Sequence, residues 1–198
     1  MNYSYLLFRF FEECFVKTRF YASGLVAVLG LFSSQAVLAY DGVITFEGEI
    51  TANTCVVKLN DSDDGTGTVT LPTISANHLS EAEDVAGLTA FTIDLSGCVL
   101  SDTTTVSTYF EPGTYVNAAG RLALLDTSEA EKVEIQLLNS KQEKIVAGAL
   151  QSEQKSTEAT MESGDTEASL SYYAQYYATG AIKAGKLSSE VSYTIVYD

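Results

Sequence analysis

Four side chains in this sequence have the chemistry needed for covalent catalysis or metal binding. They are the thiols of Cys14, Cys55 and Cys98 and the imidazole of His78. A thiol nucleophile needs a base beside it, and a zinc site needs about four nitrogen or sulfur ligands. His78 is the only histidine in the 198 residues, and no GxSxG, glycine-rich phosphate loop or paired-cysteine motif occurs. The sequence therefore predicts no catalytic residue, no metal site and no cofactor, and it places His78 in a polar surface segment.

The N-terminal segment has the organisation of a removable leader. Two basic residues precede an apolar run from Phe20 to Phe32, and Val37-Leu38-Ala39 then puts small residues at the −3 and −1 positions. This order is typical of a secretory signal peptide cleaved after Ala39, with cleavage after Ala36 as the second choice. The apolar run is shorter than the roughly 20 residues that a membrane-spanning helix needs. We expect residues 1–39 to be the signal peptide and residues 40–198 to be the mature domain.

Removal of the leader also resolves the odd number of cysteines. Cys14 is lost with it, which leaves Cys55 and Cys98 in an exported chain. A lone pair in such a chain is expected to form a disulfide. Closing a loop of about 43 residues stabilises the fold by roughly 4 kcal/mol in the chain-entropy estimate.

The mature part is strongly acidic. It has 8 basic and 24 acidic residues, which gives a net charge of −16. A surface of this sign repels nucleic acid and anionic lipid. We therefore exclude nucleic acid as a partner.

Short segments with period-2 alternation recur along the mature chain, with turn signals between them. The expected strands are residues 42–50, 54–59, 68–72, 88–98, 105–110, 121–125, 132–139, 144–150, 170–180 and 191–197. No segment has a convincing helical pattern, although residues 77–87 could hold one helical turn. So many short strands in 159 residues predict an all-β sandwich.

Three further segments have modest interpretations. Asp61 to Gly65 is acidic like a calcium loop, but the glycine and glutamate of an EF-hand would stand elsewhere, so we expect a hairpin turn. Residues 151–169 are poor in apolar side chains and are expected to form a long surface loop. The stretch SYYAQYY could be a sugar-binding platform, but we favour a buried core position with a belt at the sheet edge for its tyrosines, which are Tyr172, Tyr173, Tyr176 and Tyr177.

Four motifs occur in order along the mature chain. They are GVITFEGEITANTC before the first retained cysteine, GLTAFTIDLSGC at the second, VEIQLLN, and the ending LSYYAQYYATGAIKAGKLSSEVSYTIVYD. In the ending, Tyr197 is penultimate and Gly185 is fourteenth from the end. Each motif is weak alone, but the ordered set resembles the chaperone–usher pilins, the structural subunits of type 1-like fimbriae.

The resemblance implies an incomplete immunoglobulin-like sandwich that lacks its last strand, so that a hydrophobic groove lies beside an exposed edge. Such an edge aggregates unless it is covered. It further implies that the C-terminal strand forms one wall of the groove, and that a periplasmic chaperone binds there and anchors the terminal carboxylate. The residues expected at this site are Gly185, Val191, Tyr193, Ile195, Tyr197 and Asp198.

The resemblance also implies that a neighbouring subunit supplies the missing strand from its N-terminal segment. The candidate donor is residues 40–47, in which Tyr40, Gly42, Ile44 and Phe46 share one face. Only two residues precede Gly42 if cleavage follows Ala39, which makes this a short donor. Because donor and groove lie on one subunit, association would be head-to-tail and open-ended, which gives a fibre.

The function implied is that of a structural subunit of a surface fimbria, not an enzyme, which supports cell adhesion and biofilm formation. Its partners would be other pilin subunits, a periplasmic chaperone, an outer-membrane usher and a tip adhesin, and it would pass through the periplasm to an extracellular fimbrium. Two other classes stay open at this point. One is a monomeric secreted sandwich that binds carbohydrate through its tyrosines, with residues 40–46 as its own first strand. The other is a hydrolase that depends on His78.

Overall fold

The computed structural model describes residues 44–46, 54–60, 62, 64–100 and 102–198. Residues 44–46 belong to a separate unit from the body of the chain, which begins at Gly48. The predicted signal peptide and the predicted donor residues Tyr40 and Gly42 lie outside the described residues.

The described part of the body contains seven strands and two short 3₁₀ turns, which confirms the all-β prediction. The elements, in chain order, are β1 (Thr54–Leu59), η1 (Ala76–Leu79), β2 (Val85–Val99), β3 (Thr104–Phe110), β4 (Glu131–Leu138), η2 (Gln151–Glu153), β5 (Glu158–Met161), β6 (Glu167–Lys183) and β7 (Tyr193–Tyr197).

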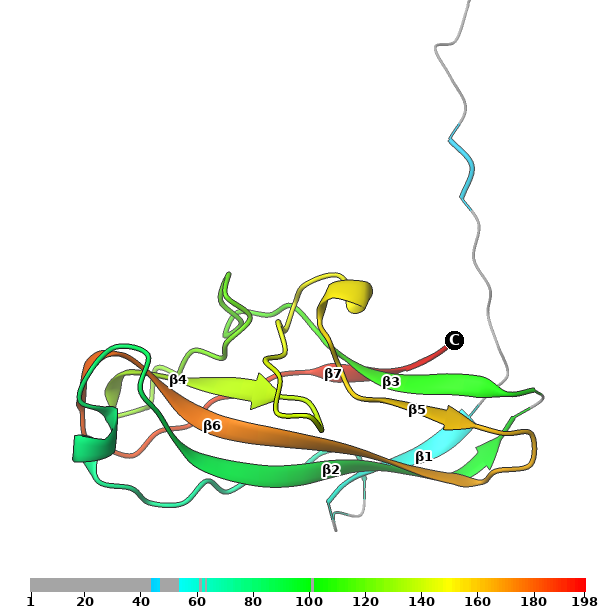
Figure 1. Cartoon of the computed structure of the whole chain (residues 1–198), viewed down its shortest axis with the longest axis horizontal. Coiled ribbons are helices and arrows are strands. Elements are labelled where there is room, and N and C mark those ends of the chain that lie inside the picture. Colours follow the sequence, from blue (N-terminus) through cyan, green and yellow to red (C-terminus); the bar gives the residue numbers. More distant parts are fainter. Residues whose placement is uncertain (1–43, 47–53, 61, 63, 101) are drawn as a thin grey trace, which may run out of the picture. The chain divides into compact units, whose positions relative to one another are not determined.

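The strands form two antiparallel sheets (Figure 1). One sheet has the order β1-β2-β6-β4 and the other has the order β5-β3-β7. The C-terminal strand β7 is therefore an edge strand, paired on one side with β3 in a register that runs from Val106 opposite Tyr197 to Phe110 opposite Tyr193.

The core lies between the two sheets and follows the predicted alternation. On β2, the side chains of Phe91, Ile93 and Leu95 are buried, and the residues between them are only partly covered. Tyr172 on β6 is fully buried at the centre, with its ring 5.5 Å from that of Phe91. Burying each such side chain stabilises the fold by about 1.5–3 kcal/mol.

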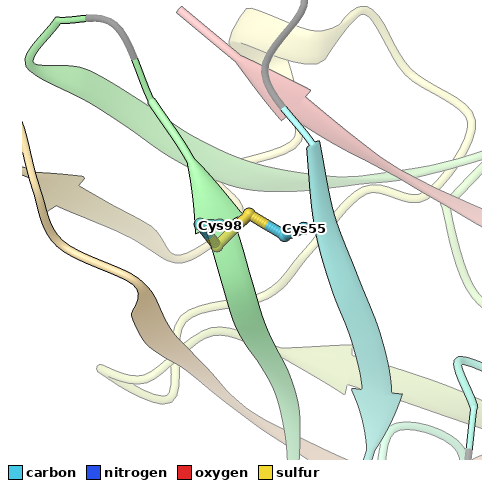
Figure 2. The surroundings of a disulfide bond; sticks show 2 residues. All are labelled: Cys55 and Cys98. Atoms are coloured by element: carbon cyan, nitrogen blue, oxygen red, sulfur yellow. A yellow bond between two sulfur atoms is a disulfide. The ribbon is translucent and has the colours of Figure 1, made fainter.

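A disulfide joins the first two strands of the larger sheet. Cys55 on β1 and Cys98 on β2 form it, with their Cα atoms 4.1 Å apart and their positions separated by 43 in sequence (Figure 2). The predicted pairing is therefore present, and it ties β1 to the sheet at the end where the β1–β2 register shifts between Thr54 and Val56.

The prediction of a long loop over residues 151–169 is wrong. This stretch contains η2, the edge strand β5 and the start of β6. Two buried side chains anchor it: Met161 in the core, and Gln154, which is 0% exposed. The Gln154 amide accepts a hydrogen bond from the Phe110 N–H (2.9 Å) and donates one to the Phe110 carbonyl (2.8 Å). A single side chain thus replaces a strand neighbour for β3 beyond the end of β5, which an average composition cannot reveal.

Three segments that we predicted as strands do not form β-ladders. Residues 68–72 have no strand partner among the described residues, and residues 121–125 and 144–150 contribute only isolated bridges at Leu122 and Lys144. Apolar side chains of all three segments pack against the core, but backbone pairing is limited to these single bridges or is absent, so no ladder forms. The turn expected over Asp61 to Gly65 follows β1, but it leads into the unpaired segment and does not close a hairpin.

We predict that Gln154→Ala destabilises the domain by roughly 2 kcal/mol, because it leaves the buried N–H of Phe110 without a partner and removes one of the hydrogen bonds to the Phe110 carbonyl, which then accepts only from the Gly148 N–H. Guanidinium unfolding of the variant and the parent in the same assembly state measures this loss. Gln142→Ala, at an exposed glutamine, is the matched control and is expected to change the midpoint little. Equal midpoints for the Gln154 variant and the control would contradict the proposed role.

Candidate functional site: the unpaired edge of β7

Each sheet has two edges, and three of the four edges carry a protection of the kind that proteins use against edge-to-edge pairing. The β4 edge is covered by bridges from Leu122 and Lys144. The β5 edge is only four residues long and begins with the exposed Glu158. The β1 edge has a register irregularity near its start.

The fourth edge, β7, has none of these protections. Its sequence, Tyr193 to Tyr197, contains no charged residue, and its pairing with β3 is regular throughout. Its other side has no strand partner in the part of the chain that the structure describes. The backbone N–H and C=O groups on that side are therefore available to another strand.

The apolar row of β7 is incompletely covered. Val191, Tyr193, Ile195 and Tyr197 pack against the core but are only half-buried, whereas Val106 and Phe110 on the neighbouring β3 are fully buried. The residues Val57, Leu59, Val69 and Leu71, from β1 and the segment after it, are half-buried against the same core. The sandwich thus leaves apolar surface uncovered where a further strand could lie.

The segment after β1 reaches β7 through a side chain alone. The Tyr193 hydroxyl donates a hydrogen bond of 2.6 Å to the Gly65 carbonyl, and a Cβ at Gly65 would lie 2.9 Å from that hydroxyl oxygen. No backbone bridge joins residues 64–72 to β7 among the described residues. The two segments therefore face each other without forming a ladder.

The C-terminal residue continues the β3–β7 pairing. Asp198 donates its N–H to the Thr105 carbonyl (2.9 Å) and accepts from the Thr105 N–H (2.7 Å). Its side chain accepts a further hydrogen bond from the Gln151 amide (3.0 Å). The chain terminus is thus held beside β3, as Figure 1 shows.

Gly185 lies outside β7, in the connection that leads from β6 to it. A Cβ at this position would lie 2.6 Å from the carbonyl carbon of Glu129, so a larger residue would displace the backbone. The adjacent carbonyl of Lys186 accepts hydrogen bonds from the N–H groups of Glu129 (2.8 Å) and Ala130 (3.2 Å). Gly185 therefore allows the close approach that directs the chain into β7.

The two predicted donor residues that the structure describes are highly exposed. Ile44 is 79% exposed and Phe46 is 89% exposed, and residues 44–46 have no assigned secondary structure. Two large apolar side chains so exposed to water on alternate positions of one segment favour burial against a partner.

The other chemical candidates do not converge on a site. His78 is exposed in η1, and no group of three His, Cys, Asp or Glu side chains within the described ranges could hold a metal ion. None of the described helical segments has the length and apolarity to cross a membrane.

The tyrosines divide between the core and the outer face of the larger sheet. Tyr172 is buried in the core, and Tyr176 packs against the core from the same face of β6 while its hydroxyl donates to the Pro72 carbonyl (3.2 Å). Tyr177 lies beneath Arg121, whose guanidinium is 4.1 Å from the ring centroid and forms an ion pair with Glu134 at 2.6 Å. Sequence reasoning missed this role of Arg121, because no local pattern links it to side chains 13 and 56 positions away.

An all-β sandwich with one unprotected edge has the kind of surface to which a further strand can add. The model of the type-1 fimbrial protein A family (FimA) matches residues 71–198. The chain is 40% identical over 177 residues to the F17 fimbrial protein of Escherichia coli, covering 87% of this chain and 96% of that one. It is also 40% identical over 168 residues to the major fimbrial subunit SMF-1 of Stenotrophomonas maltophilia, covering 82% and 96%.

Solved structures agree on the fold. The P pilus rod subunit PapA superposes with a TM-score of 0.52 at 17% identity, covering 73% of this chain and 99% of that one. A chaperone–usher pilus structure gives a TM-score of 0.51 at 17% identity, covering 80% and 96%.

The chain belongs to the type-1 fimbrial protein family. It has the incomplete immunoglobulin-like fold of the chaperone–usher pilins and is a structural pilus subunit, not an enzyme. Its membership implies polymerisation with other pilins in an extracellular surface fimbrium.

Four tyrosines make the fold sensitive to alkaline pH. Burial raises the pKa of Tyr172, Tyr176, Tyr193 and Tyr197 above the ordinary value of 10.0, and the charge of Asp64 adds to the effect at Tyr193. The unfolded chain therefore loses these protons at a lower pH than the folded chain. The stabilisation that these protonated phenols contribute is therefore fully present below about pH 10, and it is lost as pH rises through their pKa values in the folded chain.

We expect the guanidinium midpoint to fall between pH 9 and pH 12, and to fall less steeply in Tyr172→Phe, which removes one of the four phenols. Ultraviolet titration of tyrosinate measured alongside unfolding assigns the change. A midpoint that stays constant across this range would show that the buried phenols do not control stability.

Proposed function

We propose that this subunit polymerises head-to-tail by donor-strand exchange. In this mechanism, residues 40–47 of one subunit pair with β7 of the next and complete its sandwich. The observation that carries the proposal is the unprotected β7 edge with its half-buried apolar row in a chain that also exposes Ile44 and Phe46.

The β7 edge and the donor segment 40–47 are chemically complementary. A strand beside β7 would satisfy its free backbone groups, and alternate apolar side chains would fill the uncovered surface between β7 and residues 64–72. Burying Ile44 and Phe46 would contribute about 1.5–3 kcal/mol each. Tyr40 and Gly42 would continue the same face toward the N-terminus, with Gly42 where the groove is shallow.

The same edge must be covered before assembly, because an exposed apolar strand edge aggregates. We infer that a periplasmic chaperone lends a strand along β7 and binds the terminal carboxylate at Asp198. The ordered pairing of Asp198 with Thr105 supports this role, since it presents the terminus in a fixed position. Residues 1–39 would direct export of the chain to the periplasm and would then be removed.

From there, an outer-membrane usher would exchange the chaperone for the next subunit, and a tip adhesin would occupy the end of the fibre. The fibre would support cell adhesion and biofilm formation. The acidic surface suits this path, because a net charge of −16 for residues 40–198, with 8 basic and 24 acidic residues, disfavours non-specific association.

The experiment compares sheared surface fibres from four strains: the parent, a deletion of residues 40–45, Ile44→Asp, and Thr45→Asp as the matched control. In an extended segment, Thr45 lies on the opposite face from Ile44 and Phe46, so a charge at this position would remain in solvent. We expect ladders that resist dodecyl sulfate from the parent and the control. The deletion and Ile44→Asp should yield only monomer or chaperone-bound subunit. Ladders from the deletion strain, or a parent that is a stable monomer alone, would make the segment an ordinary first strand.

A further inference from the structure

The segment of residues 65–72, which we call the strap, faces β7 across the open side of the sandwich and is not held by a ladder. Its side chains Val69 and Leu71 pack against the core. Apart from the local turn that precedes it, the backbone of the strap takes part in two hydrogen bonds among the described residues. A tyrosine hydroxyl donates each of them.

The two tyrosines come from different sheets. Tyr176 on β6 donates to the Pro72 carbonyl (3.2 Å) at one end of the strap, and Tyr193 on β7 donates to the Gly65 carbonyl (2.6 Å) at the other. β6 shares a sheet with β1, which precedes the strap in the chain, whereas β7 belongs to the opposite sheet. Within the described ranges, the Tyr193 hydrogen bond is therefore the one that joins the strap to β7.

The contact between Tyr193 and Gly65 is close. The phenol is half-buried against the core, and a Cβ at Gly65 would lie 2.9 Å from its oxygen and 3.5 Å from Cγ1 of Val57. The φ angle of Gly65 lies outside the left-handed region, so the close approach and not the backbone conformation requires a glycine here. Gly65 thus lies beside β1 and beside the first residue of β7 at once.

A strand that enters between β7 and the strap would meet this contact. One edge of such a strand would pair with β7, and the other edge would present its N–H groups to the carbonyls of the strap. The hydroxyl of Tyr193 lies against the Gly65 carbonyl, on the side that faces β7. The phenol and the entering strand would therefore compete for the same backbone acceptor.

We propose that the Tyr193–Gly65 hydrogen bond is a clasp that holds the strap against β7 in the free subunit and opens before a strand enters. The proposal rests on the donor-strand polymerisation proposed above and adds a control on its rate. Because Tyr176 holds Pro72, opening moves the Gly65 end of the strap and leaves the other end in place. The N–H groups of the added strand then replace the phenol as donors.

The strength of the clasp suits this role. A neutral hydrogen bond makes a small net contribution, so it delays entry of a strand without preventing it. While it is closed, the strap covers part of the apolar surface beside β7, and such surface aggregates when it is left open. The clasp thus protects the free subunit and gives way to a strand that makes many hydrogen bonds.

The rate of peptide uptake tests the clasp. The probe is a fluorescent synthetic peptide of residues 40–50, added in excess to the purified mature chain, residues 40–198, and fluorescence anisotropy measures its binding. The variants are Tyr193→Phe, Gly65→Ala and the double variant. Tyr197→Phe is the matched control, because Tyr197 lies on the same face of β7, is also half-buried, and its hydroxyl forms no hydrogen bond within the described residues.

We expect Tyr193→Phe to bind the peptide about two- to tenfold faster than the parent, the factor that corresponds to one neutral hydrogen bond, and Tyr197→Phe to match the parent. Gly65→Ala should give a similar gain, because its Cβ displaces the phenol from the carbonyl. The double variant should be no faster than either single variant, since both changes break the same contact.

Gly65→Ala keeps the phenol, so it tests the clasp even if Tyr193→Phe does not fold. Gly67→Ala is its control in the same strap, because a Cβ there would meet only the side chain of Leu59. Unchanged or slower uptake in Tyr193→Phe or Gly65→Ala, an equal gain in either control, or additive gains in the double variant would each overturn the clasp. Absence of uptake by the folded parent would instead remove the proposed polymerisation, and the clasp with it.

Discussion

The constraint on which the structure depends is the backbone of one strand. A sheet edge exposes a row of N–H and C=O groups that must be satisfied by water or by another strand. In this subunit, the edges of β1, β4 and β5 are bulged, covered or shortened, whereas β7 is regular and uncharged. The fold concentrates its capacity for association on one strand and suppresses it elsewhere.

The rest of the molecule holds that strand in position while its sandwich is unfinished. Within the described ranges, β7 pairs only with β3, so β3 must itself be firmly held. Its inner side chains are buried, its far edge pairs with β5, and Gln154 bonds the Phe110 backbone beyond the end of β5. On the other side of the open region, the Cys55–Cys98 disulfide fixes β1. A rigid frame of this kind reduces the ordering cost when a strand is added.

The alternation of apolar and polar residues predicted strands correctly wherever one face of the strand packs against the core. The spans of β1, β3 and β4 match the expected strands to within a residue, and the apolar row of β7 is visible in the last eight residues. Pattern failed over residues 151–169, where Gln154 and Met161 anchor a polar stretch. It also overestimated pairing at residues 68–72, because alternation reports one apolar face and does not report whether a neighbouring backbone is present.

The sequence alone determined the class of fold, the cysteine pair and the buried face of each main strand. These features depend on the period of the apolar residues, on the amino-acid composition and on the number of cysteines. Tertiary structure alone decided which edges are protected, where Arg121 meets Tyr177 and Glu134, and that Tyr193 bonds the Gly65 carbonyl. The physical reason is that edges, long-range ion pairs and long-range hydrogen bonds depend on which segments become neighbours in space. Residues separated by tens of positions carry no local trace of that choice.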